Sequence, residues 1–184
     1  MADRYEGGIA FIDDAYWPIE EAKISILDFG FLRSDANQDT ISVWDGVFFR
    51  LDDHQARFER NNARLRLSCA YDRPRRNEIL AECVRRGALR NAYVQMVMTR
   101  GRAPIGVRDI RRCENRFYVF CLPYVWLAPE HQRRRGLHAL VSDIQRVPKA
   151  TVDPTIKHYQ WLDFEMGLFQ AYDAGADTVI VKDS

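Results

Sequence analysis

The sequence predicts a mixed fold, α+β or α/β, arranged in two domains. Hairpin patterns come first, helical and strand patterns alternate after them, and a stretch rich in proline and arginine interrupts this order near residue 130. We therefore expect an N-terminal α+β domain over residues 1–122, a connector over 123–136 and a C-terminal domain that begins at 137.

The strand patterns open the chain. Residues 8–12 are strand-like and end at a turn, Asp13-Asp14. A stronger signal is Asp45-Gly46 between the β-rich runs 40–44 and 47–51, because a two-residue hairpin turn needs positive φ at both positions. The first domain therefore begins with antiparallel hairpins.

Two helices are predicted next. The first covers about 54–67 and can be capped by Asp52 or Asp53. The second starts near Pro74, a residue favoured in the first turn, and ends near Gly87.

The remaining elements alternate between strand and helix. The expected order is strand 92–99, an irregular loop over 100–113, strand 116–124, strand 137–142, helix 159–173 and strand 178–182. A second domain over 137–184 would be close to the lower size limit for an independent core. We therefore expect this domain to be incomplete in the chain.

Composition and motifs exclude several classes. The 27 basic and 26 acidic residues give a net charge of +1, and the run Arg133-Arg134-Arg135 is short, so neither nucleic acid nor a membrane is expected as a partner. No phosphate-loop or GxGxxG motif occurs. The four cysteines include no CxxC and no zinc spacing, so no metal site is predicted, and Cys83 and Cys121 are expected as small buried side chains. We expect a cytoplasmic location.

Lys157 is the residue with the clearest chemical potential. Pro154 stiffens the backbone before it, and the expected helix follows it directly. The positive end of that helix would disfavour the protonated amine and so help a lysine nucleophile. On position alone, an ordinary exposed lysine remains the alternative.

A series of segments decides between these interpretations. They are 28–31 (Asp-Phe-Gly-Phe), 33–35 (Arg-Ser-Asp), 42–46 (Ser-Val-Trp-Asp-Gly), 49–54 (Phe-Arg-Leu-Asp-Asp-His), 99–101 (Thr-Arg-Gly), 123–126 (Pro-Tyr-Val-Trp) and 153–157 (Asp-Pro-Thr-Ile-Lys). This order resembles the fold-type IV aminotransferases that depend on pyridoxal 5'-phosphate (PLP), the branched-chain/D-amino-acid aminotransferase superfamily. The chain looks most like the (R)-selective amine transaminases, over roughly residues 5–183.

The resemblance implies roles for particular residues. Lys157 matches the Schiff-base lysine, which holds PLP and then moves the proton at the substrate α-carbon. Arg57 matches the arginine that binds the PLP phosphate, and it shares a predicted helix face with His54 and Asn61. Arg108 matches a loop arginine that takes substrate carboxylates. A surface helix arginine and a solvated loop arginine are the alternatives for Arg57 and Arg108.

Three positions depart from the amine-transaminase pattern: Arg33 stands before Ser-Asp, Gln38 replaces an aromatic residue, and Gln95 replaces an acidic one. A substrate pocket with Arg33 and Gln38 would be polar, and an arginine can pair with a carboxylate through two hydrogen bonds. This favours an amino acid as donor.

The sequence thus predicts a PLP-dependent aminotransferase that moves an amino group between an (R)-amine or D-amino acid and a 2-oxo acid such as pyruvate. A branched-chain aminotransferase, an aminodeoxychorismate-lyase-like enzyme and a non-catalytic fragment that acts only by association remain open. The resemblance also implies a homodimer with its active site at the subunit interface.

Overall fold

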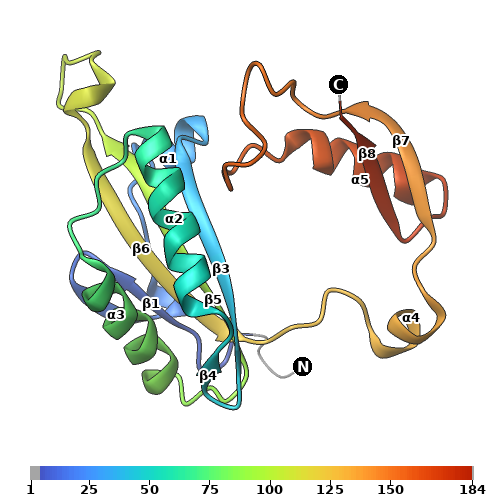
Figure 1. Ribbon diagram of the computed structural model, residues 1–184, viewed down its shortest axis with the longest axis horizontal. Helices are drawn as coiled ribbons and strands as arrows, with labels where there is room; N and C mark the ends of the chain where they lie inside the picture. The colour runs from blue at the N-terminus through green and yellow to red at the C-terminus, as the bar shows by residue number, and fades with distance from the viewer. Residues whose placement is uncertain (1–4, 184) are drawn as a thin grey trace. The chain divides into compact units, whose positions relative to one another are not determined.

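The computed structural model describes residues 5–183, which divide into two units (Figure 1). The first unit runs through Val125 and also takes in Lys157–Tyr159. The second unit covers Trp126–Ile156 and continues from Gln160. The short segment that carries Lys157 therefore belongs to the first unit, although residues of the second unit precede and follow it in the sequence.

The first unit is built on a six-stranded antiparallel sheet with the order β2-β1-β6-β5-β3-β4. The strands are β1 (Ile9–Ile12), β2 (Ala15–Pro18), β3 (Ala36–Trp44), β4 (Val47–Phe48), β5 (Ala92–Arg102) and β6 (Glu114–Pro123). The predicted strands at 92–99 and 116–124 are confirmed, with β5 reaching three residues into the expected loop. The loop also contains a short 3₁₀ turn, Ile110–Arg112.

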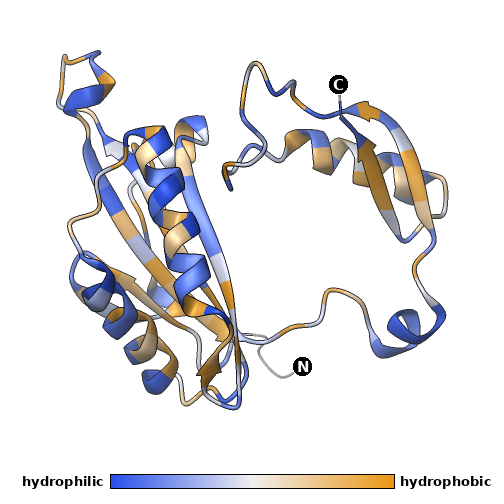
Figure 2. Ribbon diagram, viewed as in Figure 1, coloured by the Kyte–Doolittle hydropathy of each residue, from blue (hydrophilic) through white to orange (hydrophobic). Residues whose placement is uncertain are grey.

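Helices pack against this sheet (Figure 1). They are α1 (Phe29–Arg33), α2 (Leu51–Leu65) and α3 (Arg73–Arg86), and a 3₁₀ turn spans Ile19–Glu21. Both α2 and α3 mix hydrophobic and hydrophilic residues (Figure 2). The buried side chains of α3 are mostly apolar, whereas those of α2 are Phe58 and three amides, Gln55, Asn61 and Asn62. Side chains from the two helices meet side chains from β1, β3, β5 and β6 in one hydrophobic core.

The core confirms the interpretation of two cysteines. Cys83 on α3 and Cys121 on β6 are completely buried, and burial raises the pKa of the Cys121 thiol to about 11. These thiols therefore pack as small apolar groups.

The hairpin prediction is confirmed and one capping prediction is wrong. Asp45 and Gly46 adopt φ of 50° and 81° between β3 and β4. The following helix begins at Leu51, earlier than expected, because Arg50 takes a left-handed conformation (φ 51°) at its N-cap. Asp53 then lies in the first turn, where it binds the Arg50 side chain at 2.6 Å instead of capping the helix.

The second unit contains a parallel strand pair joined by a helix. Its elements are α4 (Glu130–Arg135), β7 (Ala139–Gln145), α5 (Leu162–Asp173) and β8 (Thr178–Lys182). The strand at 178–182 is confirmed, and the expected connector contains the α4 helix. Among the described residues, no helix has the length and apolar character that a membrane span requires.

One boundary prediction in this unit is wrong. The α5 helix was expected from Tyr159 but begins at Leu162, because Trp161 at its N-cap has a non-helical backbone (φ −118°, ψ 5°). The preceding residues contact the first unit instead.

Candidate active site

The site forms around β3, whose side chains alternate between the two faces of the sheet. Asn37 and Asp39 project toward α2, where the Asn37 amide donates to the Phe58 carbonyl oxygen at 3.0 Å. Gln38 and Thr40 project to the opposite face, where Thr40 contacts the Gln38 side chain and side chains of β5. One short stretch of strand therefore presents a charged group on one face and neutral polar groups on the other.

Asp39 is the central charge of the α2 side. Its side chain has no solvent exposure. Arg57 donates from Nε to one carboxylate oxygen at 2.7 Å and from Nη2 to the other at 2.8 Å. His54 Nδ1 lies 2.7 Å from the carboxylate. His54 and Arg57 reach the same acceptor because residues three apart share a helix face.

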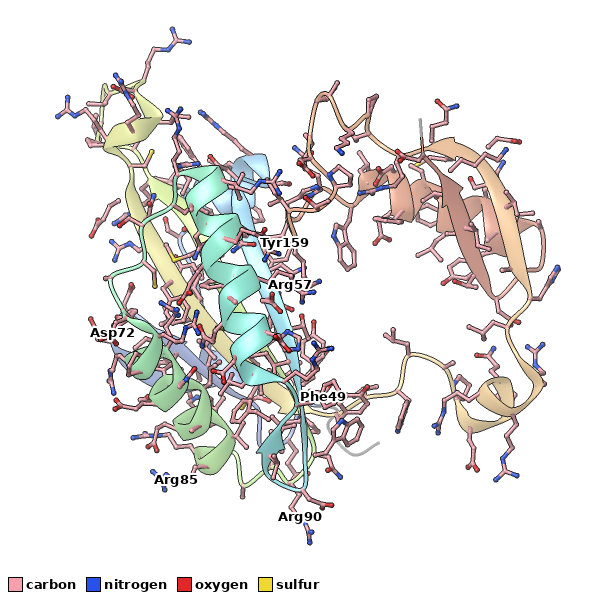
Figure 3. All side chains as sticks on the ribbon, in the orientation of Figure 1. Phe49, Arg57, Asp72, Arg85, Arg90 and Tyr159 are labelled. Atoms are coloured by element: carbon pink, nitrogen blue, oxygen red, sulfur yellow. The ribbon has the colours of Figure 1, made fainter. Side chains whose placement is uncertain are left out.

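The hydrogen bonds from Arg57 to Asp39 raise the pKa of the Arg57 guanidinium, so it remains a cation. It projects from the middle of α2 (Figure 3). Its side chain keeps 40% of its surface exposed, so the group is anchored at one edge and accessible at another. This is the arrangement that an anion-binding arginine needs.

Lys157 joins this cluster through the backbone and through charge. Its carbonyl oxygen accepts a hydrogen bond from the Gln38 N–H at 2.9 Å, so the segment adds to the open edge of β3. Burial lowers the pKa of the Lys157 amine; the nearby Asp39 carboxylate opposes this shift and Arg57 adds to it. A neutral amine is consequently easier to form here than on a free lysine.

The cause of this lowered pKa differs from the one expected. Lys157 does not stand at a helix start, because α5 begins only at Leu162. The helix dipole is therefore not responsible, since its effect is confined to the first turn. Burial of the amine against the first unit supplies the effect instead.

The opposite face of the sheet carries a network of neutral hydrogen-bonding groups. The Tyr93 hydroxyl donates to Gln95 Oε1 at 2.6 Å, and Gln95 Nε2 donates to the Tyr159 hydroxyl. Thr40 lies within 3.5 Å of both Tyr93 and Gln95 oxygens. Burial raises the pKa of Tyr159 to about 12, so its hydroxyl stays protonated near neutral pH.

An apolar pocket of about 360 Å³ borders this network. Tyr159 forms part of its wall together with Val97, Tyr118 and Phe120 from the sheet and Phe31 from α1. Polar groups and an apolar hollow thus lie next to one another within the first unit.

The structure groups three of the five predicted site residues and separates two. Lys157 and Arg57 both lie near Asp39 of β3, and Gln38 binds the Lys157 carbonyl oxygen through its backbone N–H. The Arg33 guanidinium instead lies over the Phe29 ring, 3.7 Å from its centre. Arg108 is exposed in the loop after β5. The carboxylate-binding roles of Arg33 and Arg108 therefore stay predictions.

Sequence reasoning missed Asp39 and the polar network of Tyr93, Gln95 and Tyr159. Asp39 stands among polar residues of β3, Asn37, Gln38 and Thr40, so the local pattern did not mark it for burial. The network had no local signal either, because its members come together only when the strands pair and the segment Lys157–Tyr159 joins the first unit.

The fold and the site combine a six-stranded antiparallel sheet, a β-α-β unit, and a lysine and an arginine near the same strand, β3. Residues 38–184 match the family model for amino-transferase class IV, and the chain belongs to this family.

Relatives agree with this assignment. The chain is 28% identical over 173 residues to a protein of Methanocaldococcus jannaschii described as a "Putative branched-chain-amino-acid aminotransferase", covering 94% of this chain and 57% of that protein. It is 24% identical over 126 residues to the D-alanine aminotransferase of Bacillus licheniformis, covering 68% of this chain and 44% of the other.

Solved structures show the same fold. A branched-chain amino acid aminotransferase from T.th., solved with pyridoxamine 5'-phosphate, superimposes with a TM-score of 0.85 at 23% identity, over 96% of this chain and 60% of that one. The Escherichia coli branched-chain aminotransferase gives a TM-score of 0.87 at 18% identity, over 95% and 59%. The chain thus has the fold of type IV aminotransferases over the part that it covers, which is about 60% of each of these two structures.

Proposed function

We propose that this protein is a PLP-dependent aminotransferase that moves an amino group between an amino acid and a 2-oxo acid. The observation that carries the proposal is the grouping of Lys157, Arg57 and the buried Asp39 about β3. Membership of the amino-transferase class IV family supports the same chemistry.

The residues of the site fit PLP. The cofactor needs an amine that reacts with its aldehyde and a cation for its phosphate. Lys157 supplies an amine with a lowered pKa, and Arg57 supplies an anchored, partly exposed guanidinium. When bound, PLP supplies the electron sink that makes the donor α-carbon acidic.

The chain's own groups would perform the remaining tasks. Lys157 Nζ would hold the cofactor covalently and, once released by the donor, would carry the proton to and from the α-carbon. Its lowered pKa favours the neutral form, which accepts that proton. Arg57, tied to Asp39, would keep the phosphate end in place.

The donor that we propose is an amino acid with an apolar side chain. The hydrogen-bonding groups of Gln38, Gln95 and Tyr159 suit a carboxylate, and the 360 Å³ pocket beside Tyr159 suits an apolar side chain. Named relatives include branched-chain and D-alanine aminotransferases, so both series of donors are candidates. An (R)-amine is the second candidate, because the same pocket would accept an apolar group without a carboxylate.

We further propose a homodimer located in the cytoplasm. Apolar side chains of the segment before and within α1, including Ile26 and Phe31, are largely exposed and suit a subunit interface. The cysteines are free, which suits a reducing compartment. Light scattering of the purified protein would test the dimer.

A donor comparison tests the proposed reaction. The full-length protein with PLP is supplied with D-alanine, L-leucine or (R)-1-phenylethylamine, and with pyruvate or 2-oxoglutarate as acceptor. We expect the amino acids to have the higher kcat/KM. Faster turnover of the amine would assign the site to amine transamination, and no turnover with any pair would contradict the proposal.

A further inference from the structure

Asp39 is a buried carboxylate on which two side chains of α2, Arg57 and His54, converge. Its carboxylate has no solvent exposure, binds the Arg57 fork at 2.7 and 2.8 Å, and lies 2.7 Å from His54 Nδ1. Burying a carboxylate is costly unless it is paired, and here both oxygens of Asp39 have a hydrogen-bonding partner. The proposed reaction assigns Asp39 no chemical step, so the presence of a buried carboxylate beside Arg57 needs another explanation.

We propose that Asp39 is a positioning residue that fixes the direction of the Arg57 guanidinium and sets the ionic environment of the Lys157 amine. The inference rests on the proposed function, because the anion that Arg57 would hold is the PLP phosphate. In this role Asp39 would touch neither cofactor nor donor, and it would act through Arg57 and Lys157, which do.

The geometry of the fork supports the first part. Two parallel hydrogen bonds from Nε and Nη2 fix both the place and the plane of the guanidinium. An unrestrained arginine would lose much rotamer freedom on binding an anion, whereas Arg57 has already lost it in the folded chain. Asp39 therefore strengthens anion binding by organising Arg57 beforehand.

The strand register supports the second part. Asp39 follows Gln38, whose N–H holds the Lys157 carbonyl oxygen at 2.9 Å. One strand thus sets the positions of the lysine segment and of the arginine together. Removing the charge of Asp39 should consequently change the pKa of the Lys157 amine without changing the hydrogen bond between Gln38 and Lys157.

The charged groups around the amine give the direction of that effect. Asp39 raises the pKa of Lys157 and Arg57 lowers it, while burial supplies the largest lowering. Among the neighbouring titratable groups, His54 contacts Asp39, and His158 and Tyr159 are the two residues that follow the lysine. Removal of the Asp39 charge should lower the pKa of the amine further, and removal of the Arg57 charge should raise it.

A purely structural tie between β3 and α2 is the competing explanation, and α2 offers a matched control. Glu59 lies on the same helix and binds two arginines, Arg73 and Arg76, that belong to α3. Glu59→Gln likewise replaces a carboxylate that binds arginine by an amide, at a partly exposed site that does not involve Lys157.

The test measures the cofactor-free full-length protein first. The rate at which an amine-specific reagent labels Lys157 is followed from about pH 6 to 11 by mass spectrometry, spanning the ordinary lysine pKa, in the wild type, Asp39→Asn, Arg57→Gln and Glu59→Gln. We expect a lower apparent pKa in Asp39→Asn, a higher one in Arg57→Gln and no change in Glu59→Gln. The PLP dissociation constant is then expected to rise about 5- to 10-fold in Asp39→Asn and to change less than about twofold in Glu59→Gln.

Each measurement can contradict either the positioning role of Asp39 or the proposed function. If Asp39→Asn leaves the Lys157 pKa or the PLP affinity unchanged, or tightens PLP binding, the positioning role is wrong. If the wild type fails to bind PLP, the proposed function is wrong, and the labelling of the cofactor-free protein still decides whether Asp39 governs Lys157. Circular dichroism checks folding; should Asp39→Asn fail to fold, Asp39→Ser carries the same test with a smaller neutral side chain.

Discussion

The carbonyl oxygen of Lys157 accepts a hydrogen bond from the backbone N–H of Gln38 at 2.9 Å. This bond attaches the lysine segment to the open edge of β3, one residue before the buried carboxylate of Asp39. The amine is thereby held in a partly buried place that lowers its pKa. The lowered pKa of the lysine therefore originates in burial within the first unit, to which strand pairing attaches its segment.

The first prediction concerns the phosphate end of the site. Arg57→Ala should weaken PLP binding by about 1.5–3 kcal/mol, the scale of a hydrogen bond to a charged group. Arg60→Ala serves as the control, because Arg60 is exposed on the same helix. PLP titrations followed by absorbance measure both variants, and equal affinities for Arg57→Ala and wild type would refute the assignment.

Local signals in the sequence predicted much of the fold. The Asp45-Gly46 turn, the start of α3 at Arg73-Pro74 and the strand Thr178–Lys182 all depend on residues within a few positions of one another. Such features can be recognised without knowing the tertiary structure, because turn and cap preferences are local.

The parts that sequence reasoning missed depend on contacts between distant segments. The helix expected at Tyr159 begins at Leu162 because the three residues from Lys157 belong to the first unit. Asp39 was passed over because its partners, His54 and Arg57, reach it only after α2 has packed on β3. Helical and strand patterns carry no information about such pairings.

The second prediction concerns the polar face of the sheet. Gln95→Leu removes the amide that donates to the Tyr159 hydroxyl. If this network receives the donor carboxylate, KM for an amino acid should rise about tenfold, the worth of one charged hydrogen bond. KM for (R)-1-phenylethylamine, which has no carboxylate, is the control and should stay unchanged. An equal rise for both donors would contradict the assignment.

The third prediction concerns the pH dependence of stability. Burial lowers the pKa of Lys157 from its ordinary value of 10.5, so the unfolded chain binds the proton more tightly than the folded one. The cost to stability is complete below the folded pKa and disappears as pH rises past 10.5. Cofactor-free Lys157→Met should therefore be more stable than wild type in urea at about pH 7.5, well below that value.

That advantage should shrink as the pH approaches 10.5. Lys149→Met is the control, because Lys149 is exposed. A Lys157→Met advantage that does not depend on pH would show that packing, and not the buried charge, is responsible.

The fourth prediction concerns the support of α2. Arg100 is nearly buried, binds the Asp35 carboxylate at 2.9 and 3.1 Å, and donates to the carbonyl oxygens of Leu65 and Arg66 at the end of the helix. Arg100→Ala should lower the free energy of unfolding by about 3 kcal/mol, as expected when a buried pair loses one partner.

An exposed pair gives the comparison. Arg90 and Asp45 meet at 2.7 Å with side chains that are 80% and 74% exposed, so Arg90→Ala should cost below about 1 kcal/mol. Urea denaturation measures both variants. Similar losses for the two would contradict the buried role of Arg100.

The most direct test of the central claim is to identify the lysine that binds PLP. The full-length protein is incubated with PLP, reduced with borohydride and digested, and the labelled peptide is identified by mass spectrometry. The sequence shown contains four lysines, Lys23, Lys149, Lys157 and Lys182, so the result is unambiguous among them. A phosphopyridoxyl label on Lys157 is the result that the structure predicts, and a label on one of the other three with Lys157 unmodified would contradict it.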